Sequence, residues 1–275
     1  MSGANHSTPT KAPTMVLDDA LVHQGERLFR WRSFWPVLYL ALGALALPEA
    51  ARVADWLGPR GDDALALAGL AIALLGLSIR WATIGRVPKG TSGRNTKKQV
   101  ADTLNVSGLY SVTRNPLYLG NAIALFGILV STGVWWLAVT VLLVQAFCLE
   151  RIIAVEERFL RGKFGTRFAN YAEATPIFLP DLRVWRPEIR ARWRPWALPF
   201  SARNVLRREF YGVLAAVSAI VGWDLLLDVV WRGVPLGDWI AIDWMLVSVW
   251  LGAAALFVVL RTLKKRTSLL AVAGR

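Results

Sequence analysis

The sequence predicts an all-α membrane protein of about six transmembrane helices, with a tight helical hairpin among them and both termini in the cytoplasm. Of its 275 residues, 55% are hydrophobic and only 19% are charged, whereas a soluble domain usually has about 25% charged residues. The hydrophobic residues are concentrated in long uncharged runs, as in helices that span a bilayer. This composition argues against a water-soluble enzyme and against disorder of most of the chain.

Six hydrophobic segments make up the predicted spans. The second, fifth and sixth reach the roughly 20 residues that a spanning helix needs, and the first is short unless it extends toward Val53. The third and fourth belong together, because residues 117–149 contain no charged side chain and residues 131–133 (Ser-Thr-Gly) supply a turn in the middle. These two segments predict the hairpin. The six segments are 33–48, 64–84, 117–131, 134–149, 211–231 and 239–260.

The positive charges predict the orientation of the spans. The net charge is +13, and 28 of the 32 Lys and Arg residues fall in four segments between or outside the spans. Basic residues gather on the cytoplasmic side of membrane proteins, so we expect these segments inside. Because they border the bilayer, their charge favours anionic lipid headgroups as partners rather than nucleic acid. The four inner segments are 1–32, 85–116, 150–210 and 261–275.

The spans divide the chain into five parts. Arginine alternates with Trp185, Trp193 and Trp196 after the central part, which predicts a segment lying on the inner membrane surface. The expected parts are an N-terminal tail and juxtamembrane segment at 1–32, two spans at 33–84, a core at 85–182, the interfacial Arg/Trp segment at 183–210, and two C-terminal spans with a basic tail at 211–275.

Residues of the common catalytic and metal-binding kinds are scarce. One cysteine, Cys148, and two histidines, His6 and His23, are too few for a disulfide framework or the usual zinc and iron sites, so we expect no bound metal. Asp224 and Asp228 lie four residues apart on one face of the fifth span. Carboxylates inside a membrane are usually functional, but a location at the outer end of the span explains these two equally well.

The first polar segment, residues 108–120, predicts a turn followed by the start of a helix. Pro116 suits the first turn of the third span, where its missing N–H costs nothing. Arg114 and Asn115 then lie at a helix N-terminus near the membrane surface, which suits an anion or a carboxylate. Small residues such as Gly120 leave room on one helical face, either for close packing of another helix or for a ligand.

The second polar segment, residues 150–165, extends the fourth span out of the bilayer as a charged helix that glycines end. Glu150 and Glu157 are seven residues apart and share a face, whereas Glu156 is expected to point away. A solvated, salt-bridged juxtamembrane helix explains these charges as well as a functional site does.

A basic loop at residues 86–98 is rich in glycine and hydroxyl side chains. Its Arg94, Lys97 and Lys98 are suited to hold a phosphate headgroup. The spacing matches neither the nucleoside-triphosphate loop nor the dinucleotide fingerprint. The alternative is a mobile loop whose charges only set the topology.

Together the two polar segments resemble the isoprenylcysteine carboxyl methyltransferase and phospholipid methyltransferase superfamily. Its members are integral membrane enzymes that use S-adenosylmethionine. The resemblance covers about residues 85–182 and rests on the order of the motifs around the uncharged hairpin. The matching residues are Gly108, Tyr110, Arg114, Asn115, Pro116, Tyr118 and Gly120 before the hairpin, and Glu156, Glu157, Arg161, Phe164, Gly165, Tyr171, Pro176 and Pro180 after it.

The resemblance implies a cytosolic site for S-adenosylmethionine, between the start of the third span and the helix that carries Glu156 and Glu157. A helix N-terminus suits the methionine carboxylate, and a carboxylate suits the ammonium. Glu156 or Glu157 is expected to contact the amino or ribose groups. The other residues expected to line the cofactor are Arg114, Asn115, Pro116, Tyr118, Leu119 and Gly120.

The sequence departs from the superfamily pattern in two places. Asn115 stands where many members have histidine, and an amide does not accept a proton near neutral pH. The prenylcysteine enzymes carry an arginine before the proline that follows the matching tyrosine, and residues 171–176 (Tyr-Ala-Glu-Ala-Thr-Pro) contain none. We therefore expect a membrane lipid with a phosphate or amine head as the methyl acceptor, with the isoprenylcysteine carboxylate as the alternative.

The roles expected of the remaining polar residues depend on whether the head group of the methyl acceptor is a phosphate or an amine. Arg151 is the expected catalytic cation, and the expected base for an amine head is Glu150, with Glu156 and Glu157 as the alternatives. An alternative of another class is a non-catalytic transporter or scaffold that uses Asp224 and Asp228 as an ion relay. The residues expected to bind a phosphate head are Arg86, Arg94, Lys97 and Lys98.

Overall fold

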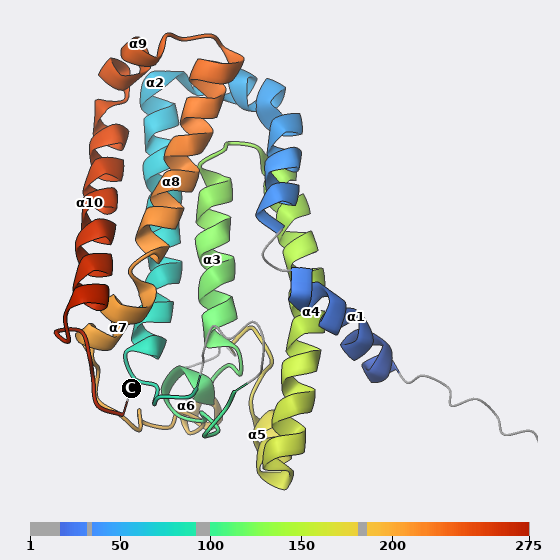
Figure 1. The fold of residues 1–275 in the computed structure, drawn as a ribbon. Helices are drawn as coiled ribbons and strands as arrows, with labels where there is room; N and C mark the ends of the chain where they lie inside the picture. The colour runs from blue at the N-terminus through green and yellow to red at the C-terminus, as the bar shows by residue number, and fades with distance from the viewer. Residues whose placement is uncertain (1–16, 32–34, 92–99, 181–185, 275) are drawn as a thin grey trace, which may run out of the picture.

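The computed structural model describes residues 17–31, 35–91, 100–180 and 186–274, and in these residues every regular element is helical (Figure 1). The elements are α1 (Leu17–Trp31), α2 (Trp35–Ile84), η2 (Gly108–Ser111), α3 (Pro116–Val130), α4 (Trp135–Phe164), α5 (Thr166–Ala174), α6 (Pro187–Arg190), α7 (Ala202–Glu209), α8 (Gly212–Leu225), η3 (Leu226–Trp231), α9 (Leu236–Ile242) and α10 (Trp244–Arg266).

Helix α2 contains both of the first two predicted segments. Its helical course is broken at Gly58, where φ is 68° and ψ is 172°, a conformation that glycine adopts readily. Figure 1 shows the chain rising beside α4, turning over and descending again beside α3. We call residues 35–57 the first arm of α2 and residues 59–84 the second arm. The first arm is therefore longer than the predicted segment 33–48.

Four of the described helical stretches are long and apolar enough to cross a membrane. They indicate an integral membrane protein, as the composition predicts. Helix α3 is apolar but shorter. The four stretches are Leu38–Ile84, Trp135–Phe164, Gly212–Trp231 and Trp244–Arg266.

The predicted hairpin is formed by α3 and α4. Helix α3 ends at Val130, and a short turn that includes Gly133, with φ of 69°, leads into α4. Helix α4 runs without interruption through the second polar segment and ends at Gly165, where φ is 52°. Of the two glycines expected to end the charged helix, Gly165 does so, whereas Gly162 lies inside α4.

The second arm of α2 packs against α3 at very short range. A Cβ atom on Gly76 would lie 2.5 Å from the carbonyl oxygen of Gly120, and one on Gly127 would lie 2.4 Å from that of Gly69. Only residues without side chains permit such an approach. Close packing therefore explains the glycines of α3, which the sequence left open between packing and ligand space.

The sixth predicted segment, 239–260, is interrupted in the structure. Helix α9 ends at Ile242, and α10 begins after Asp243. The interruption turns Trp239 inward, where it is buried and its indole N–H donates to Asp224 Oδ2 at 2.8 Å.

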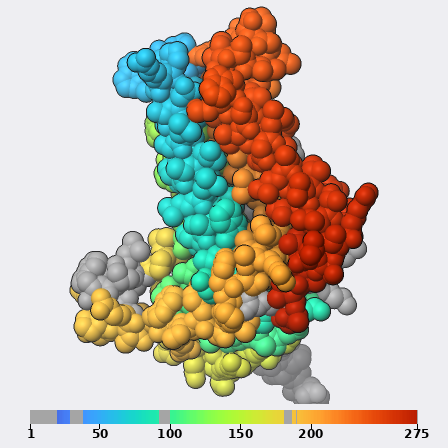
Figure 2. Space-filling model, turned by 90° about the vertical axis from the view of Figure 1, so that its left-hand side faces the viewer, coloured from blue at the N-terminus to red at the C-terminus, as the bar shows by residue number. Residues whose placement is uncertain are grey.

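The short helices α5, α6 and α7 gather at the end of the bundle where α3 begins, whereas α9 lies at the opposite end (Figure 1). Helix α7 contacts α2 and α10, and Figure 2 shows it (orange) at the base of the molecule, beside the lower parts of α2 and α10. Helix α1 crosses α4 instead (Figure 1). Polar residues from the middle and from the end of the chain therefore meet at this end.

Candidate functional site

The start of α3 is tied to α4 by two polar contacts. Arg114 Nε lies 2.9 Å from Glu157 Oε1, with side chains only 11% and 19% exposed. One turn further along α3, the hydroxyl of Tyr118 donates to Glu156 Oε1 at 2.7 Å. The site residues predicted on either side of the hairpin therefore meet in space.

Both adjacent glutamates reach α3, which corrects the expectation that Glu156 points away. Neighbouring residues of a helix are about 100° apart around its axis. Helix α3 approaches α4 between these two directions, so Glu157 reaches Arg114 while Glu156 reaches Tyr118. The spacing of residues along α4 does not indicate the direction from which α3 approaches, so the sequence alone could not predict both contacts.

The chain that follows α5 closes over the start of α3. Arg114 Nη1 donates to the carbonyl oxygen of Ala172 at 2.5 Å, and the backbone N–H of Arg114 donates to that of Pro176 at 2.8 Å. The amide of Asn115 donates to the carbonyl oxygen of Ile177 at 2.9 Å. Arg114 and Asn115 are thus held in place from three sides, and Asn115 uses its amide to bind backbone.

Tyr171 has a structural position under this site. Its hydroxyl donates to the carbonyl oxygen of Tyr110 at 2.7 Å, and its ring packs in a small buried cluster with Leu104 and Phe168. Burial raises the pKa of the Tyr171 hydroxyl above its ordinary value, so the group remains a hydrogen-bond donor. The matching tyrosine of the motif therefore fixes α5 to η2.

The predicted Arg/Trp segment contacts the first motif directly. Gly108 has φ of 58°, and a Cβ atom there would lie 2.1 Å from the ring of Trp196. The backbone N–H of Gly108 donates to the carbonyl oxygen of Arg194 at 2.8 Å, and the N–H of Arg194 donates to Ser111 Oγ at 3.1 Å. This contact was not anticipated, because nothing local in the sequence joins residues so far apart.

Of the residues expected to bind a phosphate head, Arg86 is described, whereas Arg94, Lys97 and Lys98 lie outside the described residues. The guanidinium of Arg86 stacks on two aromatic rings, 5.0 Å from the centroid of Trp196 and 4.9 Å from that of Phe200. It also donates to the carbonyl oxygen of Ala82 at 3.1 Å. Through these contacts Arg86 holds the Arg/Trp segment in place.

The expected catalytic pair lies where α1 crosses α4. Arg151 Nε donates to Gln24 Oε1 of α1 at 2.8 Å, and Arg151 Nη1 lies 3.1 Å from Glu150 Oε2. The guanidinium also stacks on Phe147, with its carbon 3.3 Å from the ring centroid. Arg151 thus contacts both Glu150 and α1, and neither Arg151 nor Glu150 takes part in the ion pair of Arg114 and Glu157.

The other expected cofactor residues lie on α3 itself. Pro116 is buried at the first helical position, and Leu119 is half-buried. Gly120 is buried and faces the second arm of α2, where a Cβ atom would lie 2.7 Å from Arg80 Cγ. Gly120 therefore makes room for Arg80.

A buried ion pair that sequence reasoning missed joins α2 to α7. Arg80 Nε and Nη2 donate to the two carboxylate oxygens of Glu209 at 2.9 and 2.8 Å, with side chains 8% and 2% exposed. Arg80 Nη1 donates to Asn121 Oδ1 of α3 at 2.8 Å. The signal in the sequence is that Arg80 is a single arginine inside the predicted span 64–84.

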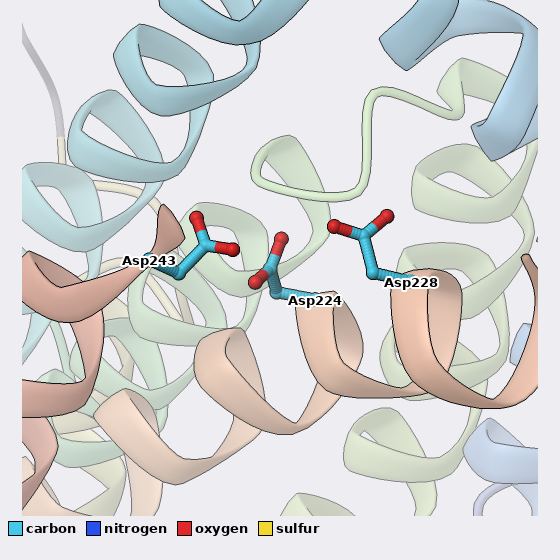
Figure 3. A group of neighbouring side chains, drawn as sticks. All are labelled: Asp224, Asp228 and Asp243. Atoms are coloured by element: carbon cyan, nitrogen blue, oxygen red, sulfur yellow. The ribbon is translucent and has the colours of Figure 1, made fainter. Parts of the chain in front are cut away.

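Asp224 and Asp228 share a face, as predicted, and meet Asp243 at the opposite end of the bundle. Carboxylate oxygens of the three lie within 4.8 Å of one another (Figure 3). Arg232 pairs with Asp228 at 2.8 Å and with the exposed Asp55 at 2.6 Å. Burial, followed by the charge of Asp228, raises the pKa of Asp243 to about 6.

Comparison with known proteins identifies the family. A family model described as phospholipid methyltransferase matches residues 65–167. The cobalt-zinc-cadmium resistance protein CzcN of Cupriavidus metallidurans is 40% identical over 163 residues, which are 58% of this chain and 68% of the relative. The nickel-cobalt-cadmium resistance protein NccN of Alcaligenes xylosoxydans xylosoxydans is 32% identical over 129 residues, 46% of this chain and 57% of the relative. No solved structure matches.

The matched region contains the hairpin and both halves of the contact between Arg114 and Glu157. The resemblance that the two polar segments indicated is confirmed, and the chain belongs to the phospholipid methyltransferase family.

Proposed function

We propose that this protein is an integral membrane methyltransferase that transfers the methyl group of S-adenosylmethionine to a lipid-borne acceptor. The observation that carries the proposal is the ion pair between Arg114 and Glu157, which joins the two family motifs across the hairpin. Tyr118 and Glu156 add a second polar contact beside it.

The side chains around this ion pair fit the cofactor chemically. Arg114 suits a carboxylate, and Glu157 suits an ammonium group. The amino-acid end of S-adenosylmethionine carries one group of each kind, so it can replace the contact that the two residues make with each other. The first turn of α3, with Pro116 at its first position, also presents the positive end of the helix dipole to the same region.

The protein's part in such a reaction is alignment rather than proton transfer. Bound S-adenosylmethionine supplies an electrophilic methyl group on a sulfonium. Arg114 is held by Ala172 and Pro176, and Tyr118 holds Glu156, so the polar groups are fixed before the cofactor arrives. Fixed, half-buried groups favour displacement at a methyl group by orienting the reactants and limiting water.

We propose that the site faces the cytosol at the inner leaflet. The two arms of α2, then α3, α4, α8 and α10, make six crossings, and both ends of the chain then lie on the same side as the start of α3. The distribution of basic residues favours the cytoplasmic side for that end. The named relatives come from bacteria, which supports the inner membrane of a bacterium.

The acceptor that we propose is a membrane lipid with a phosphate or amine head. The stretch from Tyr171 to Pro176 lacks the arginine of the prenylcysteine enzymes, and two of its backbone carbonyls, those of Ala172 and Pro176, accept from Arg114. An isoprenylcysteine carboxylate is therefore the less favoured acceptor.

Isothermal titration of the detergent-purified protein with S-adenosylmethionine tests the proposal. We expect binding by the wild type and its loss in Arg114→Ala and in Glu157→Ala. Exposed residues of α5 provide matched controls, Arg167→Ala and Glu173→Ala, which are expected to bind as the wild type does. A folded wild-type protein that does not bind S-adenosylmethionine would overturn the proposal.

A second candidate function is a contribution to resistance against divalent transition metals. The names of both relatives, which are metal resistance proteins, favour it. Bacterial growth in graded cobalt, zinc and cadmium, with the wild type, Arg114→Ala or Asp243→Asn, separates the two candidates. Loss of resistance in Arg114→Ala alone would make resistance a consequence of methyl transfer. Loss in Asp243→Asn alone would favour a non-catalytic role such as transport.

A further inference from the structure

Asn121 is a polar residue exposed on an otherwise apolar helix. Helix α3 presents alanine, leucine, isoleucine and phenylalanine along most of its length, and Asn121 lies exposed in its second turn. On a helix that crosses a membrane, an amide group is favourable only where a polar group or water reaches it. Helix packing accounts for the amide oxygen, which accepts from Arg80 Nη1 of α2, but not for the amide nitrogen, because the buried face of α3 is formed by Gly120 and Ala124.

Arg80 fixes which way the amide of Asn121 points. A guanidinium can only donate hydrogen bonds, so the amide atom that faces Arg80 Nη1 at 2.8 Å is the oxygen. The amide nitrogen is consequently turned away from Arg80, and within the described residues it donates to no protein acceptor. The side chain thus presents an N–H donor outward.

The ion pair behind Asn121 holds this orientation. Glu209 engages two nitrogens of Arg80 and leaves the third for Asn121. Gly120 gives the stem of Arg80 room to pass, since a Cβ there would collide with Arg80 Cγ. Because Glu209 balances the charge of Arg80, Asn121 offers a directed neutral donor rather than a positive charge.

We propose that Asn121 donates a hydrogen bond to an oxygen of the membrane lipid that serves as methyl acceptor. The inference rests on the proposed function and its topology. Asn121 is five residues beyond Pro116, about 7–8 Å along the helix, which is the depth of phosphate and ester oxygens rather than of the acyl chains. The amide N–H of Asn121 can donate a hydrogen bond to a phosphate or ester oxygen, but it cannot bind an ammonium group, which is itself a donor.

The position also relates the lipid to the cofactor site. Asn121 lies three residues after Tyr118, whose hydroxyl binds Glu156. One short stretch of α3 therefore holds the contact to α4 and the outward donor. A lipid anchored at Asn121 has its head held beside the start of α3, where the methyl donor is proposed to bind. We assign Asn121 as a positioning residue for the acceptor.

Two substitutions separate the donor from the structure around it. Asn121→Asp keeps an oxygen for Arg80 and replaces the outward N–H₂ by an oxygen, so it removes the donor while retaining the link to Arg80 and Glu209. Asn121→Leu removes both. Phe126→Leu, at another exposed position of α3, is the matched control.

Isothermal titration with dihexanoyl phosphatidylethanolamine and dihexanoyl phosphatidylglycerol measures the lipid contact, and S-adenosylmethionine is titrated separately. We expect a loss of about tenfold in lipid affinity in Asn121→Asp and Asn121→Leu, the size of one hydrogen bond. The affinity for S-adenosylmethionine should remain within about twofold of the wild type, and Phe126→Leu should match the wild type with both ligands.

The outcomes separate the inference from the proposed function. Equal lipid affinity of the wild type and Asn121→Asp, or no lipid binding by the wild type, would overturn the inference. Inorganic phosphate that binds with the same dependence on Asn121 would show a free anion in place of the lipid and would also overturn it. Lipid binding that depends on Asn121 in a protein that does not bind S-adenosylmethionine would sustain the lipid contact and reject the methyltransferase.

Discussion

Arg114 Nε and Glu157 Oε1 lie 2.9 Å apart across the α3–α4 hairpin, and neither side chain is more than one-fifth exposed. Two charges in such surroundings stabilise the fold only as a pair, because each would otherwise be desolvated without compensation. The same two charges are the groups to which we assign the ends of the cofactor's amino acid. Stability and ligand binding are therefore coupled at these two residues.

A charge reversal separates the two roles. Either single change, Arg114→Glu or Glu157→Arg, should lower the midpoint of thermal unfolding by several degrees and abolish binding of S-adenosylmethionine. The double variant restores an ion pair, so it should recover part of the stability without recovering binding, since the charges now stand on the wrong elements. Binding by the double variant would contradict the assignment of these residues to the cofactor. Thermal unfolding in detergent and isothermal titration provide the two measurements.

Close packing of α2 on α3 leads to a prediction about glycines. Gly76→Ala places a Cβ 2.4 Å from the backbone nitrogen of Ala124, and backbone cannot move aside cheaply. We expect a destabilisation of about 1–3 kcal/mol, read as a lower unfolding midpoint. Gly222→Ala in α8 is the control, because a Cβ there meets nothing within 4 Å and alanine favours a helix over glycine. A Gly76→Ala variant as stable as Gly222→Ala would show that the helices are further apart.

The hairpin and its motifs were predictable because they are local. An uncharged run with a small-residue turn in its middle specifies two helices, and Gly165 ends the second where expected. The fold class, the family and the meeting of the two motifs follow from such patterns. Whether Gly120 serves helix packing or leaves space for a ligand could not be predicted from such patterns, since the answer depends on Arg80 of another helix.

The features that escaped prediction depend on contacts between distant parts of the chain. Arg80 and Glu209 are 129 residues apart, and no periodicity links them. Trp239 is buried, and its indole N–H donates to Asp224 of a different helix, a contact that no local pattern in the sequence indicates. Tertiary partners of this kind override local preference, and they define the C-terminal half of the structure.

The ion pair of Arg80 and Glu209 leads to a third prediction. Glu209→Ala leaves a buried guanidinium with less compensation and should cost about 3–5 kcal/mol. Replacing both residues, Arg80→Met with Glu209→Leu, should recover much of that loss while weakening lipid binding, because Asn121 is no longer oriented. Arg232→Ala, which breaks contacts to the exposed Asp55, should cost only about 1 kcal/mol. Urea unfolding measures all three, and a double variant less stable than Glu209→Ala would contradict this account.

The acidic cluster predicts how stability depends on pH. The pKa of Asp243 is raised from 3.8 to about 6, so between these values the folded protein holds a proton that the unfolded chain releases. Folding is then favoured at the lower end of this interval, and the contribution of Asp243 to stability is lost as the pH rises through about 6. Asp243→Asn should therefore unfold at a higher temperature than the wild type above pH 6, with a difference that shrinks toward pH 4. Asp238→Asn, at an exposed position of α9, should show no such trend, and a difference for Asp243→Asn that is constant from pH 4 to 8 would place the effect outside its ionisation.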